Sequence, residues 1–101
     1  MNANKMKKII YSILKEITEG DKVPLHSDYE ITHDEFLQIV RLMCNEGYLN
    51  KKWVIFDILG NVSIIKQLDL VTMKGIEFLE ENNKWNKLYK GLKEFRDFLP
   101  L

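Results

Sequence analysis

Apolar residues recur with helical spacing near the start of the chain. They form one stripe at intervals of three and four residues: Met6, Ile9, Ile10, Ile13, Leu14 and Ile17. This spacing predicts an amphipathic helix over residues 5–19. Gly20 can end this helix, and the extended conformation favoured before Pro24 separates it from the next segment. Residues 26–31 contain few large apolar side chains, so we expect only a weak helical turn there.

The next helical stripe has clear start and stop signals. Thr32 is a good N-cap, and Glu35 completes a capping box, which together predict a helix over residues 33–46. The apolar stripe of this helix consists of Phe36, Ile39, Val40 and Met43. Gly47 suits the left-handed conformation that follows many helices.

A β-rich pattern occupies residues 52–69. Two runs rich in β-branched and aromatic residues lie on either side of Gly60-Asn61, which predicts an antiparallel hairpin. Thr72 then caps a predicted helix over residues 72–82. A last apolar stripe predicts a C-terminal amphipathic helix over residues 84–99: Trp85, Leu88, Tyr89, Leu92, Phe95 and Leu99.

The order of these elements predicts the fold class. Helix, weak turn, helix, hairpin, helix and helix make a mainly-α α+β fold in one domain over residues 1–101. This is the arrangement of a winged helix-turn-helix with a β-hairpin wing and an added C-terminal amphipathic helix. The phrases "EGYL" (46–49) and "LVTMKGIEFLEEN" (70–82) resemble the steps into and out of the wing in many winged-helix regulators.

Several longer phrases resemble one family. They are "YSILKEITEG" (11–20), "VPL" (23–25), "ITHDEF" and "EGYL" within 31–49, "VTMKGIEFLEEN" (71–82) and "KWNKLYKGLKEFRDFL" (84–99). The chain resembles the YjcQ-like family of small winged-helix proteins from Gram-positive bacteria and their phages, with the hairpin matching least well. The resemblance implies a winged helix with an added C-terminal helix and a DNA-linked or phage-related role. It implies no catalytic residues.

Composition and charge narrow the classes of function. The chain has 15 basic and 15 acidic residues, whereas a dedicated non-specific nucleic-acid binder usually has a basic excess. No run approaches the roughly 20 apolar residues needed to span a bilayer, so we expect no membrane association. The single cysteine, Cys44, can form no internal disulfide, and we expect a cytoplasmic protein.

The helix over residues 33–46 occupies the place of a DNA-recognition helix. Its polar face carries Gln38, Arg41 and Asn45, residue types that can read base edges. Lysines of the wing are candidates for phosphate contacts: Lys51, Lys52 and Lys66. Residues 25–49, however, include one basic and five acidic residues, a net charge of −4. Because Lys and Arg supply most non-specific affinity, we expect at most weak binding to duplex DNA.

The alternative function is a protein-interaction module that does not touch nucleic acid. Neutral net charge, the acidic segment and the apolar strands favour it. The C-terminal helix offers candidate contacts at Trp85, Tyr89, Leu92 and Phe95. These side chains either pack on their own domain, which leaves a monomer, or pair two copies as a homodimer.

The sequence gives little support for catalysis. His26 and His33 lie near the carboxylates of Asp28, Asp34 and Glu35, but no helical His-x-x-x-His pair or cysteine cluster accompanies them. The single cysteine has no base at helical spacing, and there is no Gly-rich phosphate loop. We therefore expect a protein that is not an enzyme and that has no metal and no cofactor.

Overall fold

The fold is built around α1 (Ala3–Glu19), whose apolar stripe is buried. The computed structural model describes residues 1–20 and 22–86. Helix α1 begins two residues before the predicted helix because Asn2 acts as its N-cap, its side-chain oxygen accepting the N–H of Lys5 at 2.7 Å. At the other end the N–H of Gly20 donates to the carbonyl of Glu16 at 2.8 Å.

The expected weak turn is the short 3-10 helix η1 (His26–Tyr29). It is anchored on α1 because the buried Tyr29 hydroxyl donates to Ser12 Oγ at 2.9 Å. Helix α2 (His33–Asn45) follows through the predicted capping box. Thr32 Oγ1 accepts the N–H of Glu35 at 3.1 Å, and Glu35 Oε1 accepts the N–H of Thr32 at 3.0 Å. The second of these bonds lowers the pKa of the Glu35 carboxyl.

The hairpin has much shorter strands than the apolar runs suggested. Strands β1 (Val54–Phe56) and β2 (Val62–Ile64) pair antiparallel, with Ile55 opposite Ser63. The first predicted run is shortened because its start forms the 3-10 turn η2 (Lys51–Trp53).

The loop between the strands is held by one carboxylate. The Asp57 carboxylate accepts the N–H groups of Leu59 and Asn61, both at 2.9 Å. These hydrogen bonds lower its pKa. The five-residue connection between β1 and β2 therefore has a defined shape, with Gly60 at a φ of +83°.

A short bridge closes the base of the wing. Leu49 pairs antiparallel with Val71 outside the named strands, and the N–H of Asn50 donates to the carbonyl of Leu70 at 2.8 Å. The segment after α2 is thus paired directly with the segment before α3 (Met73–Glu81). This pairing brings the two ends of the hairpin together.

Thr72 connects the same two phrases through its side chain. Its hydroxyl caps α3 by accepting the N–H of Gly75 at 3.0 Å, and it contacts the carbonyls of Gly47 and Tyr48. A Cβ on Gly75 would lie 2.6 Å from the Tyr48 carbonyl oxygen and 2.8 Å from Val71 Cγ1. Position 75 therefore requires glycine because the two backbones approach so closely.

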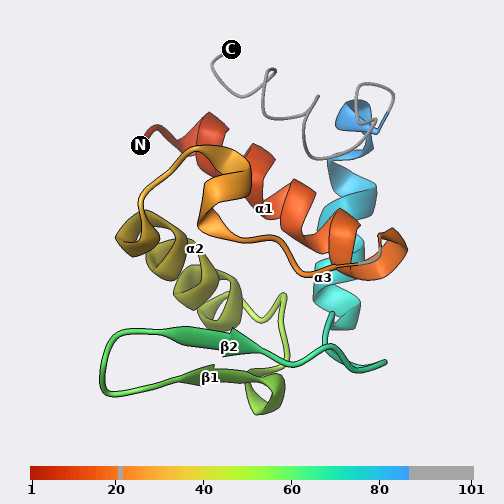
Figure 1. Ribbon diagram of the computed structural model, residues 1–101. Coiled ribbons are helices and arrows are strands. Elements are labelled where there is room, and N and C mark those ends of the chain that lie inside the picture. Colours follow the sequence, from red (N-terminus) through yellow and green to blue (C-terminus); the bar gives the residue numbers. More distant parts are fainter. Residues whose placement is uncertain (21, 87–101) are drawn as a thin grey trace.

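The architecture is a mainly-α α+β, winged-helix-like fold. In Figure 1, α1 lies between α2 and α3, and the hairpin lies at the bottom of the view with its loop directed away from α3. The 3-10 turn η3 (Asn83–Trp85) follows α3, and the buried Trp85 meets Tyr11 edge to face with ring centroids 5.6 Å apart. Lys84 and Trp85, the first positions of the predicted C-terminal helix, belong to η3, and its residues after position 86 lie outside the described residues.

Gly75 provides a test of this junction. Replacing an exposed helical glycine by alanine normally stabilises a helix by about 1 kcal/mol. We expect Gly75→Ala to reduce the free energy of unfolding by about 1–3 kcal/mol instead, because the new methyl group overpacks the contact with Tyr48. Urea denaturation measures the change, with Glu77→Ala on the same helix as the control that stays within about 0.5 kcal/mol. An unchanged or higher stability of Gly75→Ala would contradict the close approach.

Candidate functional site

The polar face of α2 turns toward the wing. Gln38, Arg41 and Asn45 are all exposed, at the spacing that places them on one side of the helix. The Arg41 guanidinium lies 4.2 Å from the centroid of the Phe56 ring in β1. This cation–π contact connects α2 to the hairpin and orients the guanidinium.

Three of the six predicted DNA contacts come together around one pocket. Arg41 and Asn45 of α2 and Lys51 of η2 line a hollow of about 240 Å³ between the helix and the hairpin. Its floor is less polar, with Cys44, Val54 and Phe56. The structure thus groups two donors capable of base contacts with one candidate phosphate contact. Gln38 shares their helix face but does not line the pocket.

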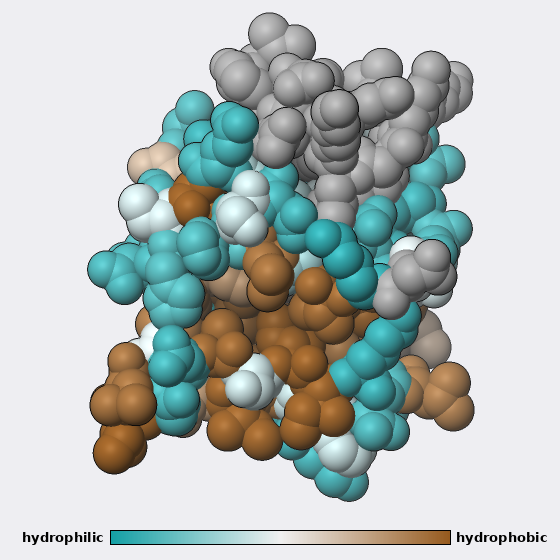
Figure 2. All heavy atoms as spheres, in the orientation of Figure 1, coloured by the Kyte–Doolittle hydropathy of each residue, from teal (hydrophilic) through white to brown (hydrophobic). Residues whose placement is uncertain are grey.

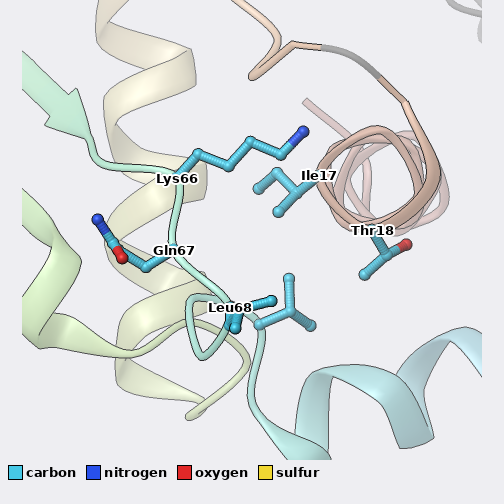
Figure 3. Close-up of a pocket in the computed structure, with 6 residues that line it drawn as sticks. Ile17, Thr18, Lys66, Gln67 and Leu68 are labelled. Atoms are coloured by element: carbon cyan, nitrogen blue, oxygen red, sulfur yellow. The ribbon is translucent and has the colours of Figure 1, made fainter.

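The other two lysines have partners within the protein. Lys52 Nζ lies 4.9 Å from the centroid of the neighbouring Trp53 ring. Lys66 Nζ donates to the carbonyl oxygen of Gly20 at 3.1 Å, at the C-terminal end of α1. Figure 3 shows its side chain extending toward α1, past Ile17. A cation there complements the carbonyl end of the helix, so Lys66 has a structural role as well as a charge.

Lys66 also borders an open hollow between α1 and the segment after β2. This open pocket of about 520 Å³ is lined by Ile17, Thr18, Lys66, Gln67, Leu68 and Val71. Figure 3 shows the labelled residues coming from two places, the last turn of α1 and the segment after β2. The Thr18 hydroxyl is turned back to its own helix, donating to the Leu14 carbonyl at 2.9 Å. We assign no chemistry to this hollow.

Negative charge borders the α2 face at its start. Asp34 and Glu35 occupy the first turn of α2, where carboxylates interact favourably with the helix dipole. Glu35 is also part of the capping box. These carboxylates are therefore explained by folding alone. They still repel a polyanion that approaches the first turn of the helix.

The wing exposes apolar side chains that the sequence did not single out as a site. At the loop, Ile58 and Leu59 are 100% and 82% exposed, and Ile55 in β1 and Ile65 directly after β2 are also exposed. Figure 2 shows apolar residues gathering over the lower half of this face, including the loop end of the hairpin. We call these four residues the apolar wing surface. A pair of large apolar residues at a turn, where polar residues are usual, was the available sequence signal.

The aromatic candidates for an interaction helix divide into two groups. Trp85 is buried against Tyr11, so its ring belongs to the core. Tyr89, Leu92 and Phe95 lie outside the described residues.

Residues 1–20 and 22–86 contain neither a metal-binding cluster of three or more side chains nor a membrane-spanning helix. Within these ranges, no three or more His, Cys, Asp or Glu side chains are grouped so that they could hold a metal ion. No helix of the described part is long and apolar enough to cross a bilayer.

Comparisons with known proteins agree on one family. The model of a family described as "YjcQ protein" matches residues 11–98. The chain is also 34% identical, over 99 residues, to the "Uncharacterized protein YjcQ" of Bacillus subtilis (strain 168). That alignment covers 98% of this chain and 99% of the relative. No solved structure matches the chain significantly.

The cysteine in the Arg41 pocket is poorly suited to nucleophilic chemistry. Cys44 is only 5% exposed, and burial raises the pKa of its thiol. The charges of Lys51 and Arg41 act in the opposite direction, with a smaller effect. Because the thiolate is the reactive form, the buried Cys44 is expected to be inert.

Cys44 reactivity can be measured directly, since it is the only cysteine of the chain. We expect the folded protein to react with a thiol-specific disulfide reagent at neutral pH at least about tenfold more slowly than the urea-unfolded chain, because burial disfavours the thiolate. The absorbance of the released chromophore gives both rates. Equal rates in the two states would show an accessible, activated thiol in the pocket.

Proposed function

The chain belongs to the YjcQ family, and on this premise we propose that it is a small, non-catalytic regulatory protein that binds another protein through its wing. The observation that carries the proposal is the apolar wing surface. Ile58 and Leu59 are exposed in the loop. Ile55 in β1 and Ile65 directly after β2 are the other two exposed residues of this surface. Clustered exposed apolar residues on a small domain are typical of protein contact sites.

The shape of the hairpin supports a protein partner. Two strands of three residues each leave open backbone edges, to which an extended segment of a partner can add. The Asp57 carboxylate is held by two backbone N–H groups, which stabilise its ionised form and fix its position in the loop. Because Ile58 and Leu59 are the most exposed apolar side chains of the loop, we expect the partner to present an apolar surface to them.

A wing suited to tracking a DNA backbone would need different chemistry at its end. The loop has no basic side chain between Asp57 and Asn61, so it cannot neutralise phosphates. Burying Ile58 and Leu59 against a protein contributes about 1.5–3 kcal/mol for each side chain. The same residues gain little beside a solvated phosphate backbone. This difference is why we place the protein partner first.

Weak duplex DNA binding is the second candidate function. The specific observation that favours it is the grouping of Arg41, Asn45 and Lys51 around one pocket, with Gln38 on the same helix face. The Phe56 ring holds the Arg41 guanidinium in place, which reduces the entropy lost on contact. The acidic first turn of α2 limits the affinity.

The wing proposal is tested with the double variant Ile58→Ser/Leu59→Ser. Bait protein is crosslinked in an extract of the source organism, and the captured partner is then titrated against purified variants. We expect about a 100-fold or greater loss of affinity, because each replaced side chain removes more than about 1.4 kcal/mol of burial.

The matched control is Met73→Ser, which removes an apolar residue that is 74% exposed from α3 instead of the wing. It should bind the partner as the unchanged protein does. If the wing variant also binds normally, the apolar wing surface is not the contact site. If sedimentation shows that the unchanged protein dimerises and the wing variant does not, a second copy covers the wing and the proposed partner is wrong.

The DNA candidate makes a separate prediction about salt. A fluorescent duplex of mixed sequence should bind weakly at low salt, and Arg41→Ala and Lys51→Ala/Lys52→Ala should each weaken it. With Lys51 and Lys52 on phosphates, the logarithm of affinity should fall with that of salt at a slope of about −2. Lys66→Ala is the control that keeps binding, since that cation is bound to the carbonyl of Gly20. No binding at low salt, or none lost with Arg41→Ala, would exclude this mechanism.

A further inference from the structure

Two histidines that are seven positions apart in the sequence meet in the fold. His26 begins η1 and His33 begins α2, and their ring centroids lie 5.6 Å apart with the ring planes at 86°. They are the only two histidines of the chain. Both line a pocket of about 170 Å³ between the start of α2 and strand β2, whose residues Val62 and Ile64 form part of the wall.

One ring nitrogen is already fixed by the backbone. His26 Nδ1 lies 3.3 Å from the carbonyl oxygen of Ile31. Because a carbonyl oxygen only accepts hydrogen bonds, this contact places the proton on Nδ1 and leaves the lone pair of a neutral ring on Nε2. Histidines that bind metals are usually held in this way, with the second nitrogen donating to a backbone carbonyl or a carboxylate.

We propose that His26 and His33 form a two-histidine binding site for a divalent transition-metal ion of the zinc class. Imidazole is a preferred ligand for Zn²⁺, Ni²⁺ and Cu²⁺. Two imidazoles on one tetrahedral ion, with nitrogen–metal distances of about 2.0–2.1 Å, have ring centroids on the order of 5 Å apart. The observed separation of 5.6 Å is close to that value.

The site supplies two protein ligands, and the coordination is completed by water. Among the described residues no third His, Cys, Asp or Glu joins the pair. Binding is therefore weaker than at a structural zinc site with four protein ligands. A metal ion with open coordination positions can exchange ligands, and the pocket that both rings line has a volume of about 170 Å³.

Because the two histidines lie on different elements, a metal ion bound to both would join η1 to α2. An ion held by both rings clamps η1 to the first turn of α2, beside the β2 residues that line the same pocket. Binding to the folded state alone raises stability in proportion to the logarithm of the metal concentration above the dissociation constant. The ion would thereby stiffen the element that presents the polar face of α2. This inference does not depend on which partner the wing binds.

The test uses tag-free, full-length protein titrated with Zn²⁺ in a calorimeter and melted with and without the metal. We expect one Zn²⁺ per chain and a rise in Tm of about 5 °C at a saturating concentration. His26→Gln and His33→Gln should each reduce the affinity at least tenfold and abolish the rise in Tm. Glutamine keeps a polar side chain of similar length, and circular dichroism confirms that each variant is folded.

Cys44→Ser is the matched control, because Cys44 is the only thiol of the chain and thiolate is a preferred zinc ligand. It should bind Zn²⁺ as the unchanged protein does. Nuclear magnetic resonance should show the largest shifts at the His33 ring and at Val62 and Ile64, which line the pocket. The proposal is overturned if Zn²⁺ does not bind, if both glutamine variants bind it unchanged, or if binding is lost only with Cys44→Ser. In those cases the two rings are an aromatic packing pair.

Discussion

The close approach of Gly75 to the Tyr48 carbonyl is the constraint on which the arrangement of the other elements depends. Only a residue without a Cβ lets the first turn of α3 lie on the backbone that leaves α2. Thr72 fixes the same contact through its side chain, which caps α3 and also contacts the carbonyls of Gly47 and Tyr48. With the base of the wing closed by the Leu49–Val71 bridge, the hairpin is a fixed projection.

The position of the hairpin on the core determines which of its side chains face outward. The residues packed beneath the hairpin, among them Val54 and Phe56, are held against the core, so the alternate residues of each strand face outward. Ile55 therefore cannot be withdrawn into the core without breaking the strand register. Phe56 also supports the Arg41 guanidinium, so one strand orients the polar face of α2 and the apolar wing surface together.

Local signals in the sequence were reliable where the cause was local. The capping box of Thr32 and Glu35 and the left-handed Gly47 involve residues within a few positions of each other, and both are present in the structure. The strands were overestimated because β propensity does not show where a hairpin stops. There the 3-10 turn of Lys51–Trp53 and the Asp57 loop decide the ends. The positions of Lys66 and Trp85 could not be predicted, since their partners on α1 are more than forty residues away.

The sequence by itself determined the order of the elements and the mainly-α, winged-helix-like class, because periodicity, caps and turn residues act over short distances. Family membership followed from the resemblance of whole phrases, and the comparisons confirm it. The tertiary structure decided which of the candidate residues share a surface. It grouped Arg41, Asn45 and Lys51, directed Lys66 to the end of α1 and placed His26 against His33. These groupings depend on how α1, α2 and the hairpin pack, and no spacing along the chain encodes a distance between side chains on different elements.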